Sequence, residues 1–145
     1  MTLRTAMLAT AGALAATFSA YAFEATTLAD YSGEEIFLRY CAACHGEMGR
    51  GNGPVARSLK IPAPDLTAIG RHYGGFPTAL VRGVIDGRGS GIGAHGTRTM
   101  PVWGYEFWME EGGDDVARRQ MQDVITKLVD YIRSIQDDSV AANRN

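Results

Sequence analysis

Apolar and polar positions along the chain recur with the spacing of α-helices, and no segment shows the alternation of a β-strand. In the clearest pattern, near the carboxyl end, apolar residues follow one another in steps of four and three: Met121, Ile125, Leu128, Ile132 and Ile135. This spacing places them on one face, because 3.6 residues complete a helical turn. The pattern predicts a long amphipathic helix over residues 114–136.

An earlier helix is predicted by the segment YSGEEIFLRYCAACHG. Ser32 and Glu35 stand three residues apart, which is the arrangement of a capping box at a helix start. Apolar side chains then follow at helical spacing, so we expect a helix over residues 33–43. Cys41 and Cys44 would lie one turn apart on the same face of it.

Two shorter helices are predicted in the middle of the chain. Pro62 and Pro64 indicate an extended segment that leads to a short helix over residues 65–69. Pro77 suits a first helical turn, and Gly87 suits the end of the helix that follows. The next stretch, GRGSGIGAHGTRTMPVWG, is rich in glycine and predicts a loop. The expected fold class is all-α, with about four helices on one core.

Composition narrows this picture only a little. The 145 residues are enough for one domain and short for two. A hydrophobic content of 46% and a charged content of 21% are ordinary for a soluble globular protein. The net charge of −2 gives no support for a nucleic-acid partner, which requires a basic surface. We expect one domain over residues 23–138 and a polar tail over residues 139–145.

The amino-terminal segment MTLRTAMLATAGALAATFSAYA has the pattern of a secretory signal peptide. Arg4 precedes an apolar, alanine-rich run, and Ala20-Tyr21-Ala22 matches an A-x-A cleavage site. We therefore expect residues 1–22 to be removed after Ala22 and the protein to be periplasmic. The run is too weakly apolar for a comfortable span of about 20 residues, and no second span follows it. No stable membrane insertion is expected after cleavage.

The two cysteines of the chain stand in CAACHGEMGRGNGP, with His45 directly after the second. C-x-x-C-H is the attachment signature of haem c. Thioether bonds to two vinyl groups need both sulfurs on one helix face, and the next histidine can bind the iron. We expect one covalent haem c on Cys41 and Cys44. A redox dithiol would need flanking strands, and a zinc site would need two more ligands, for which His72 and His95 lack the paired spacing.

With these features the chain resembles a class I c-type cytochrome. The resemblance rests on the signal peptide, C-x-x-C-H on an amino-terminal helix, a methionine on a distant loop, and a closing amphipathic helix. It covers residue 23 to about residue 136. It implies that the first and last helices cross and pack closely. The residues expected at this crossing are Gly33, Tyr40, Leu128, Tyr131 and Ile132.

The second axial ligand of the iron is expected from the segment TRTMPVWG. Electron carriers fill this position with a strong ligand, and class I cytochromes resemble this chain in having a Met-Pro pair. The resemblance therefore implies Met100 as the ligand opposite His45, with His95 as the alternative. The other methionines after the signal peptide lack this context: Met48, Met109 and Met121.

Two further features are expected around the haem. A ligating imidazole usually donates its second N–H to a carbonyl or carboxylate, and in the resembling family a proline carbonyl past the attachment motif accepts it. Pro54 is the candidate here. Four aromatic residues follow Met100, and one or two of them are expected to wall the haem: Trp103, Tyr105, Phe107 and Trp108.

These features predict a periplasmic electron carrier that cycles between Fe(II) and Fe(III) and is not an enzyme. Its partners would be redox proteins, namely a dehydrogenase as donor and an oxidase or another cytochrome as acceptor. The alternative is a cytochrome subunit bound to a periplasmic dehydrogenase that relays electrons to a downstream acceptor. A third hypothesis, a catalytic haem protein such as a peroxidase, requires that Met100 does not bind the iron.

Overall fold

The computed structural model describes residues 26–88 and 100–137. The α-helices are α1 (Gly33–Tyr40), α2 (Ala42–His45), α3 (Ile69–Tyr73), α4 (Thr78–Asp86), α5 (Trp103–Glu110) and α6 (Asp115–Ser134). Three short 3₁₀ helices are labelled η1 (Leu28–Asp30), η2 (Ala56–Ser58) and η3 (Leu66–Ala68). These ranges contain no strand, so the expected all-α class is confirmed. The predicted signal peptide, His95 and the tail over residues 139–145 lie outside the described residues.

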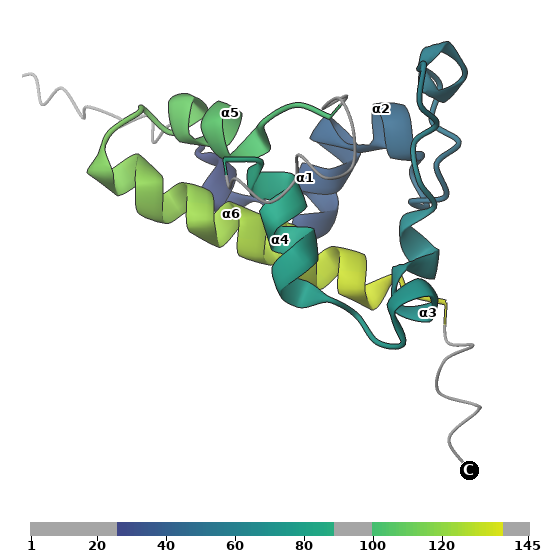
Figure 1. Ribbon diagram of the computed structural model, residues 1–145. Helices are drawn as coiled ribbons and strands as arrows, with labels where there is room; N and C mark the ends of the chain where they lie inside the picture. The colour runs from purple at the N-terminus through teal and green to yellow at the C-terminus, as the bar shows by residue number, and fades with distance from the viewer. Residues whose placement is uncertain (1–25, 89–99, 138–145) are drawn as a thin grey trace, which may run out of the picture.

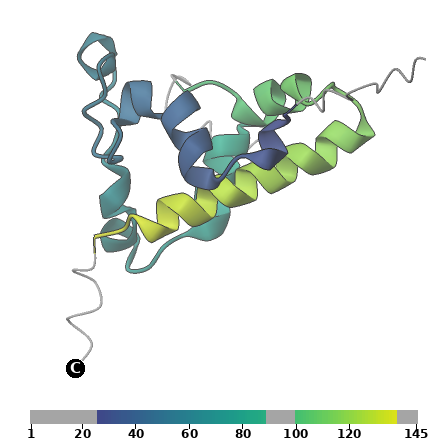
Figure 2. The same cartoon turned by 180° about the vertical axis from the view of Figure 1, so that it is seen from behind.

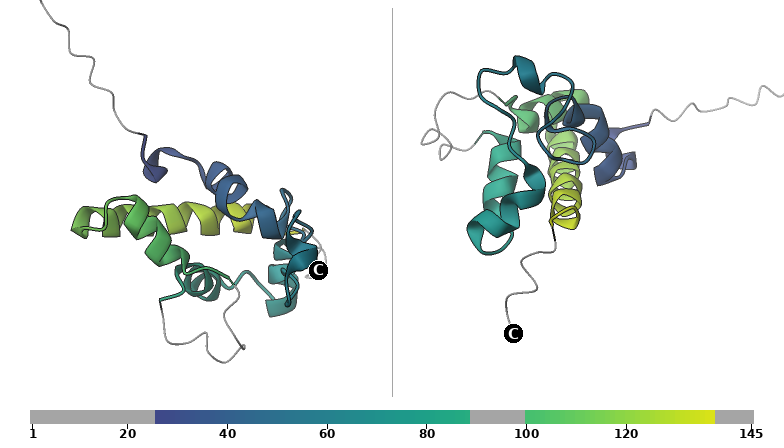
Figure 3. Two further views of the ribbon diagram at one scale, coloured as in Figure 1. Left: turned by 90° about the horizontal axis from the view of Figure 1, so that it is seen from above. Right: turned by 90° about the vertical axis from the view of Figure 1, so that its right-hand side faces the viewer.

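The longest helix, α6, forms the centre of the arrangement (Figure 1). α1 lies on one side of it and α4 on the other, as the views in Figure 3 show. Asp114 begins α6 by accepting a hydrogen bond from the N–H of Ala117 at 2.8 Å. Four of the five residues in the predicted stripe are buried and Ile135 is half-buried. The predicted helix is confirmed, and it ends at Ser134.

α1 begins with the predicted capping box. The Ser32 hydroxyl accepts from the N–H of Glu35 at 3.2 Å, and the Glu35 carboxylate accepts from the N–H of Ser32 at 2.8 Å. Together these bonds satisfy two of the backbone donors that a helix start leaves without partners. The helix is interrupted after Tyr40 and resumes as α2, which carries it to His45.

The expected crossing of the first and last helices is present (Figure 2). Gly33 allows it, because a Cβ at this position would lie 2.2 Å from the carbonyl oxygen of Lys127. The rings of Phe37 and Tyr131 pack with centroids 5.2 Å apart. Tyr40 contributes differently from what we expected, because its aromatic partners belong to α5 and not to α6.

α5 corrects the sequence-based assignment, which continued the loop to Gly104. The aromatic residues that were left without an element form this helix, and Phe107 is fully buried on it. A glycine near the start weakens the local preference for helix. Here it is required, because a Cβ on Gly104 would lie 2.7 Å from the carbonyl oxygen of Asp86. Packing against α4 and α6 therefore decides this element.

The shorter helices lie near their predicted places. Pro77 is the residue before α4, and Gly87 ends it with a φ of 67°. The short helix predicted over residues 65–69 is a 3₁₀ turn that continues as α3 to Tyr73. The described residues thus hold six α-helices where about four were expected. In this part of the chain no helix is both long and apolar enough to cross a membrane.

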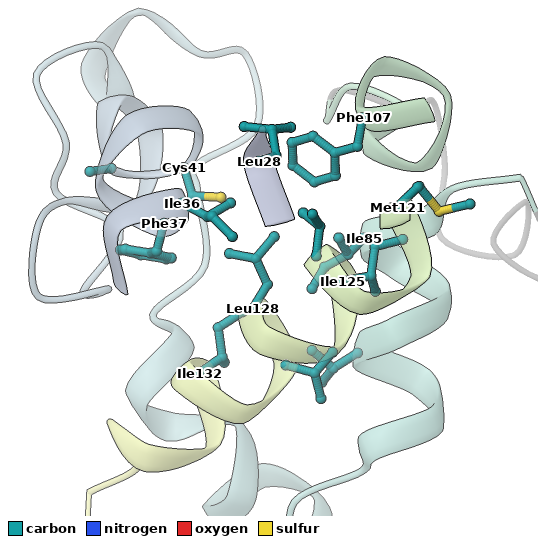
Figure 4. Close-up of a cluster of buried hydrophobic side chains, with 14 residues drawn as sticks. Leu28, Ile36, Phe37, Cys41, Ile85, Phe107, Met121, Ile125, Leu128 and Ile132 are labelled. Atoms are coloured by element: carbon teal, nitrogen blue, oxygen red, sulfur yellow. The ribbon is translucent and has the colours of Figure 1, made fainter. Parts of the chain in front are cut away.

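The hydrophobic core lies where α1, α4, α5 and α6 meet (Figure 4). Met121, Ile125 and Leu128 of α6 are fully buried in it. Several core residues also line the cavity described next: Phe37, Cys41, Val81, Ile85 and Ile132. The same packing that joins the helices therefore shapes the candidate site.

Candidate functional site

A cavity of about 980 Å³ lies beside the core. It is lined by α1, α2, the segment 59–66, α3, α4, the start of α5 and Ile132 of α6. This volume is at the upper end of the range of about 300–1,000 Å³ typical of cofactor sites. Most lining side chains are apolar. Ile61 and Tyr73 line it while remaining 46% and 59% exposed, so the cavity reaches the surface.

Both cysteines line this cavity. Cys41 stands between α1 and α2, and its carbonyl accepts from the N–H of Cys44 at 3.2 Å and of His45 at 2.9 Å. This tight turn keeps the two sulfur-bearing residues one turn apart beside the same space, as the spacing predicted. They form no disulfide. Two thiols beside an apolar cavity of this size suit a covalently attached haem.

The surroundings of Cys41 keep its thiol protonated. Burial raises the pKa of its thiol to about 12, and the neighbouring Cys44 adds to the effect. Cys41 therefore does not supply the nucleophilic thiolate that a reactive C-x-x-C pair needs in one of its two cysteines. No strand flanks the motif in the described residues. A zinc site is not supported either, because residues 26–88 and 100–137 contain no group of three or more side chains that could together hold a metal ion.

His45 closes α2 and lines the cavity. Its Nδ1 lies 3.3 Å from the carbonyl oxygen of Pro64. A carbonyl only accepts, so Nδ1 carries the proton and Nε2 keeps its lone pair. Burial lowers the pKa of this imidazole, although the bond to Pro64 opposes the shift. The side chain is therefore neutral at neutral pH, which is the form that binds a metal.

The prediction that the carbonyl of Pro54 accepts this hydrogen bond is wrong. The loop after the motif folds back on α2, where the N–H of Gly53 donates to the carbonyl of Cys44 at 3.1 Å. This leaves Pro54 exposed. The N–H of Leu66 donates to the carbonyl of Gly49 at 2.7 Å and holds the segment after Pro64 against that loop. The correct carbonyl comes from a more distant proline, which spacing from the motif does not reveal.

Met100 lines the same cavity as His45, is half-buried, and packs against the core. Pro101 and Trp103 follow it along the cavity wall, so one of the four aromatic residues borders the site as expected. The remaining methionines are elsewhere. Met48 and Met109 are 71% and 50% exposed, and Met121 is buried in α6. The structure therefore brings together the cysteines, the histidine and the methionine that the sequence singled out.

His72 and Tyr73 also line the cavity, and neither was among the expected site residues. Both are on α3, whose extension beyond residue 69 was not expected. The signal was present in the sequence as the segment GRHYGG, since Gly74, with a φ of 69°, ends the helix there.

Three curated relatives align with about half of this chain. Cbb3-type cytochrome c oxidase subunit FixP of Azorhizobium caulinodans is 37% identical over 76 residues, which are 52% of this chain and 24% of the relative. FixP of Bradyrhizobium diazoefficiens is 37% identical over 71 residues, 49% of this chain and 20% of the relative. Subunit CcoP of Azospirillum brasilense is 34% identical over 71 residues, 49% of this chain and 21% of the relative.

The aligned part is therefore less than a quarter of each relative's own length. No solved structure gives a significant match. The sequence family described as cytochrome c oxidase, cbb3-type, subunit III matches residues 29–118, which include the attachment motif, Met100 and most of the cavity lining. Since this match spans more than half of the chain, the protein belongs to that family of c-type cytochromes.

Proposed function

We propose that this chain is a single-haem electron-transfer protein that binds its iron between His45 and Met100 and works as one subunit of a larger redox complex. The observation that carries the proposal is the single apolar cavity that Cys41, Cys44, His45 and Met100 all line. When bound, haem c supplies one-electron chemistry by alternating between Fe(II) and Fe(III).

The side chains of the site have separate roles in this proposal. Cys41 and Cys44 hold the cofactor through thioether bonds, so it cannot dissociate. His45 offers a neutral Nε2, because Pro64 holds the proton on Nδ1. Met100 supplies a thioether sulfur, a ligand that raises the reduction potential. The apolar lining excludes water and disfavours the additional positive charge of the oxidised state.

A redox partner would exchange electrons with the bound group at the part of the cavity that reaches the surface. Ile61, Tyr73 and Leu80 line the cavity and are exposed. A partner that docks over these residues approaches the cofactor without any rearrangement of the core. The chain therefore acts as a relay, and the chemistry of a substrate takes place on the partner.

The names of the relatives support a complex over a freely diffusing carrier, since all three are subunits of an oxidase. We propose an oxidase as the acceptor side and the periplasm as the location, for which the amino-terminal pattern is the support. Size exclusion of a native extract tests the association. Elution of the haem-bearing chain far above its own mass supports a subunit, and elution at the mass of the free chain supports a diffusing carrier.

Spectroscopy of the purified protein tests the ligands. Haem c should give the visible spectrum of a low-spin cytochrome and a mass increased by one covalent haem. Met100→Ala should abolish the near-infrared band of sulfur bound to Fe(III) and allow peroxide to bind. Met109→Ala, which truncates an exposed methionine, should leave both unchanged. An unaltered band in Met100→Ala contradicts the ligation, and peroxide binding to the unmodified protein favours a peroxidase.

A further inference from the structure

A cluster of polar side chains lies where α6 ends, and one of its members, Asp65, also lines the cavity. Arg50 comes from the loop after the attachment motif, and its two terminal nitrogens lie 3.4 and 3.2 Å from the carboxylate oxygens of Asp137. Nη1 of Arg50 also donates to the hydroxyl of Thr67 at 3.3 Å and lies 3.9 Å from Asp65. The guanidinium thus joins three parts of the chain that are distant in sequence.

The centre of the cluster is the hydroxyl of Thr67, which belongs to the one buried polar side chain among the described residues. Its proton goes to Asp65 at 2.6 Å, and an oxygen of Asp137 lies 3.3 Å away. Asp65 also accepts from the N–H of Thr67 at 2.9 Å. Because the Thr67 side chain is buried, loss of these bonds would leave its hydroxyl without a partner, and this favours keeping the partners in place.

This cluster is linked through the backbone to both partners of the His45 hydrogen bond. Pro64, whose carbonyl faces Nδ1 of His45, is directly followed by Asp65. Arg50 is directly followed by Gly51, whose N–H donates to the backbone carbonyl of His45 at 2.7 Å. Arg50 and Asp65 therefore connect the loop that holds the histidine to the segment that holds its acceptor.

Two residues that follow α6, Gln136 and Asp137, hold the same segment. The amide of Gln136 donates to the carbonyl of Leu66 at 2.8 Å and accepts from the N–H of Gly70 at 2.8 Å. The N–H of Asp137 donates to the carbonyl of Thr67 at 2.9 Å. The segment that begins at Pro64 is thus fixed by backbone and side-chain bonds from the residues just past α6.

We propose that Arg50 and Thr67 are positioning residues for the axial imidazole, because they hold the Pro64 carbonyl at the Nδ1–H of His45. This inference rests on the proposed function, in which His45 binds the iron. A ligating imidazole that keeps this hydrogen bond is more basic and donates more electron density to the metal. Loosening the bond therefore favours Fe(II), and the reduction potential rises.

The direct charge effect of Arg50 has the opposite sign. Loss of a nearby cation favours Fe(III) and lowers the potential. The informative variants are therefore those that keep the charge. Arg50→Lys keeps the cation but not the two-pronged contact with Asp137, and Thr67→Val removes only the hydroxyl. Arg50→Lys changes a half-exposed side chain, so it remains informative if the buried Thr67→Val fails to fold.

Matched controls are available on α6. Arg133→Lys breaks a similar arrangement, in which Arg133 contacts Asp130 at 2.6 Å and Thr78 at 2.9 Å. Thr126→Val removes a hydroxyl that donates to the carbonyl of Gln122 at 2.7 Å. Neither residue lines the cavity or contacts the segment after Pro64.

The experiment uses haem-loaded protein and two measurements, the reduction potential and the NMR exchange rate of the Nδ1 proton of His45 in the ferrous state. Both test variants should raise the reduction potential. They should also accelerate exchange of the Nδ1 proton by about five- to tenfold, which is the effect of losing one hydrogen bond. Both controls should match the wild type. Test variants that unfold at lower temperature but keep the wild-type potential and exchange rate overturn the proposal, since the cluster is then structural only.

Failure of the proposed function looks different. It would appear in the wild type, as a chain without covalent haem or as haem without a histidine signal in the ferrous NMR spectrum. That result overturns this inference as well. A wild type with normal haem spectra and unresponsive variants overturns the positioning role alone.

Discussion

At the scale of single residues, burial favours the uncharged form of two side chains of the site. Removal from water disfavours the charged form of every group. It therefore raises the pKa of the Cys41 thiol and lowers the pKa of the His45 imidazole, and both side chains stay neutral. A neutral imidazole is a ligand, and a neutral thiol is not a redox nucleophile. The same physical term thus favours metal binding by His45 and disfavours a nucleophilic role for Cys41.

Tyr40 gives a pH-dependent test at this scale. Burial raises the pKa of its phenol to about 12, and the hydrogen bond of 2.6 Å to Glu110 contributes, while the nearby Arg39 opposes it. The ordinary value is 10.0. Between these values the folded protein keeps a proton that the unfolded chain has lost. The contribution of Tyr40 to stability is therefore complete below about pH 10 and is lost as the pH rises through 12.

Denaturant unfolding of the haem-loaded protein at pH 9 and pH 11 measures this effect. The wild type should lose more unfolding free energy over that interval than Tyr40→Phe, which has no proton to titrate. Tyr105→Phe, at a half-exposed tyrosine of α5, should behave as the wild type. If the wild type and Tyr40→Phe lost equal unfolding free energy over this interval, titration of Tyr40 would not account for the pH dependence.

At the scale of elements, the crossing of α1 and α6 depends on a glycine at the first position of α1. Gly33→Ala would set its Cβ against the backbone of Lys127, and one helix would have to move. Overpacking of this kind costs about 1–3 kcal/mol. We expect Gly33→Ala to lower the free energy of unfolding by this amount, as measured by denaturant titration of the haem-loaded protein.

Gly83 is the matched control for this prediction. It lies inside α4, and a Cβ there would meet nothing within 4 Å. Gly83→Ala should therefore stabilise the protein by about 0.4–1 kcal/mol, because the unfolded chain loses conformational freedom. Opposite signs for the two substitutions support the crossing. A stabilising effect of Gly33→Ala would show that the helices do not approach this closely.

At the scale of the whole molecule, the cavity is too large to be a packing defect. Well-packed interiors contain few voids larger than a water molecule, and this one measures about 980 Å³. Five buried residues of the core line it: Phe37, Cys41, Val81, Ile85 and Ile132. A group that fills the cavity would therefore add contacts to the core.

We expect a Cys41→Ser/Cys44→Ser chain, made without covalent haem, to keep much of its helix but to lose fixed tertiary packing. Circular dichroism should show the far-ultraviolet helix signal and little near-ultraviolet signal, and the dye ANS should bind. Met100→Ala, which keeps both thioether attachments, is the control and should remain packed. A sharp unfolding transition in the double variant, at the temperature of the loaded protein, would show that the fold does not need the cofactor.

The sequence by itself determined whatever depends on neighbours within one or two turns. The capping box of α1 is confirmed because Ser32 and Glu35 meet across three residues. Cys41 and Cys44 flank one turn for the same reason, and the stripe on α6 follows from 3.6 residues per turn. The resemblance to class I cytochromes added Met100, whose place on the cavity wall no local pattern specifies.

Only the tertiary structure decided the remaining features, because each joins residues far apart in the chain. The acceptor of the His45 proton is Pro64 and not Pro54, since the loop between them folds back on α2. α5 forms although Gly104 weakens its local preference for helix, because burial of Phe107 against α6 outweighs the intrinsic cost. Contacts of this kind are fixed by packing, which a reading of one segment at a time does not include.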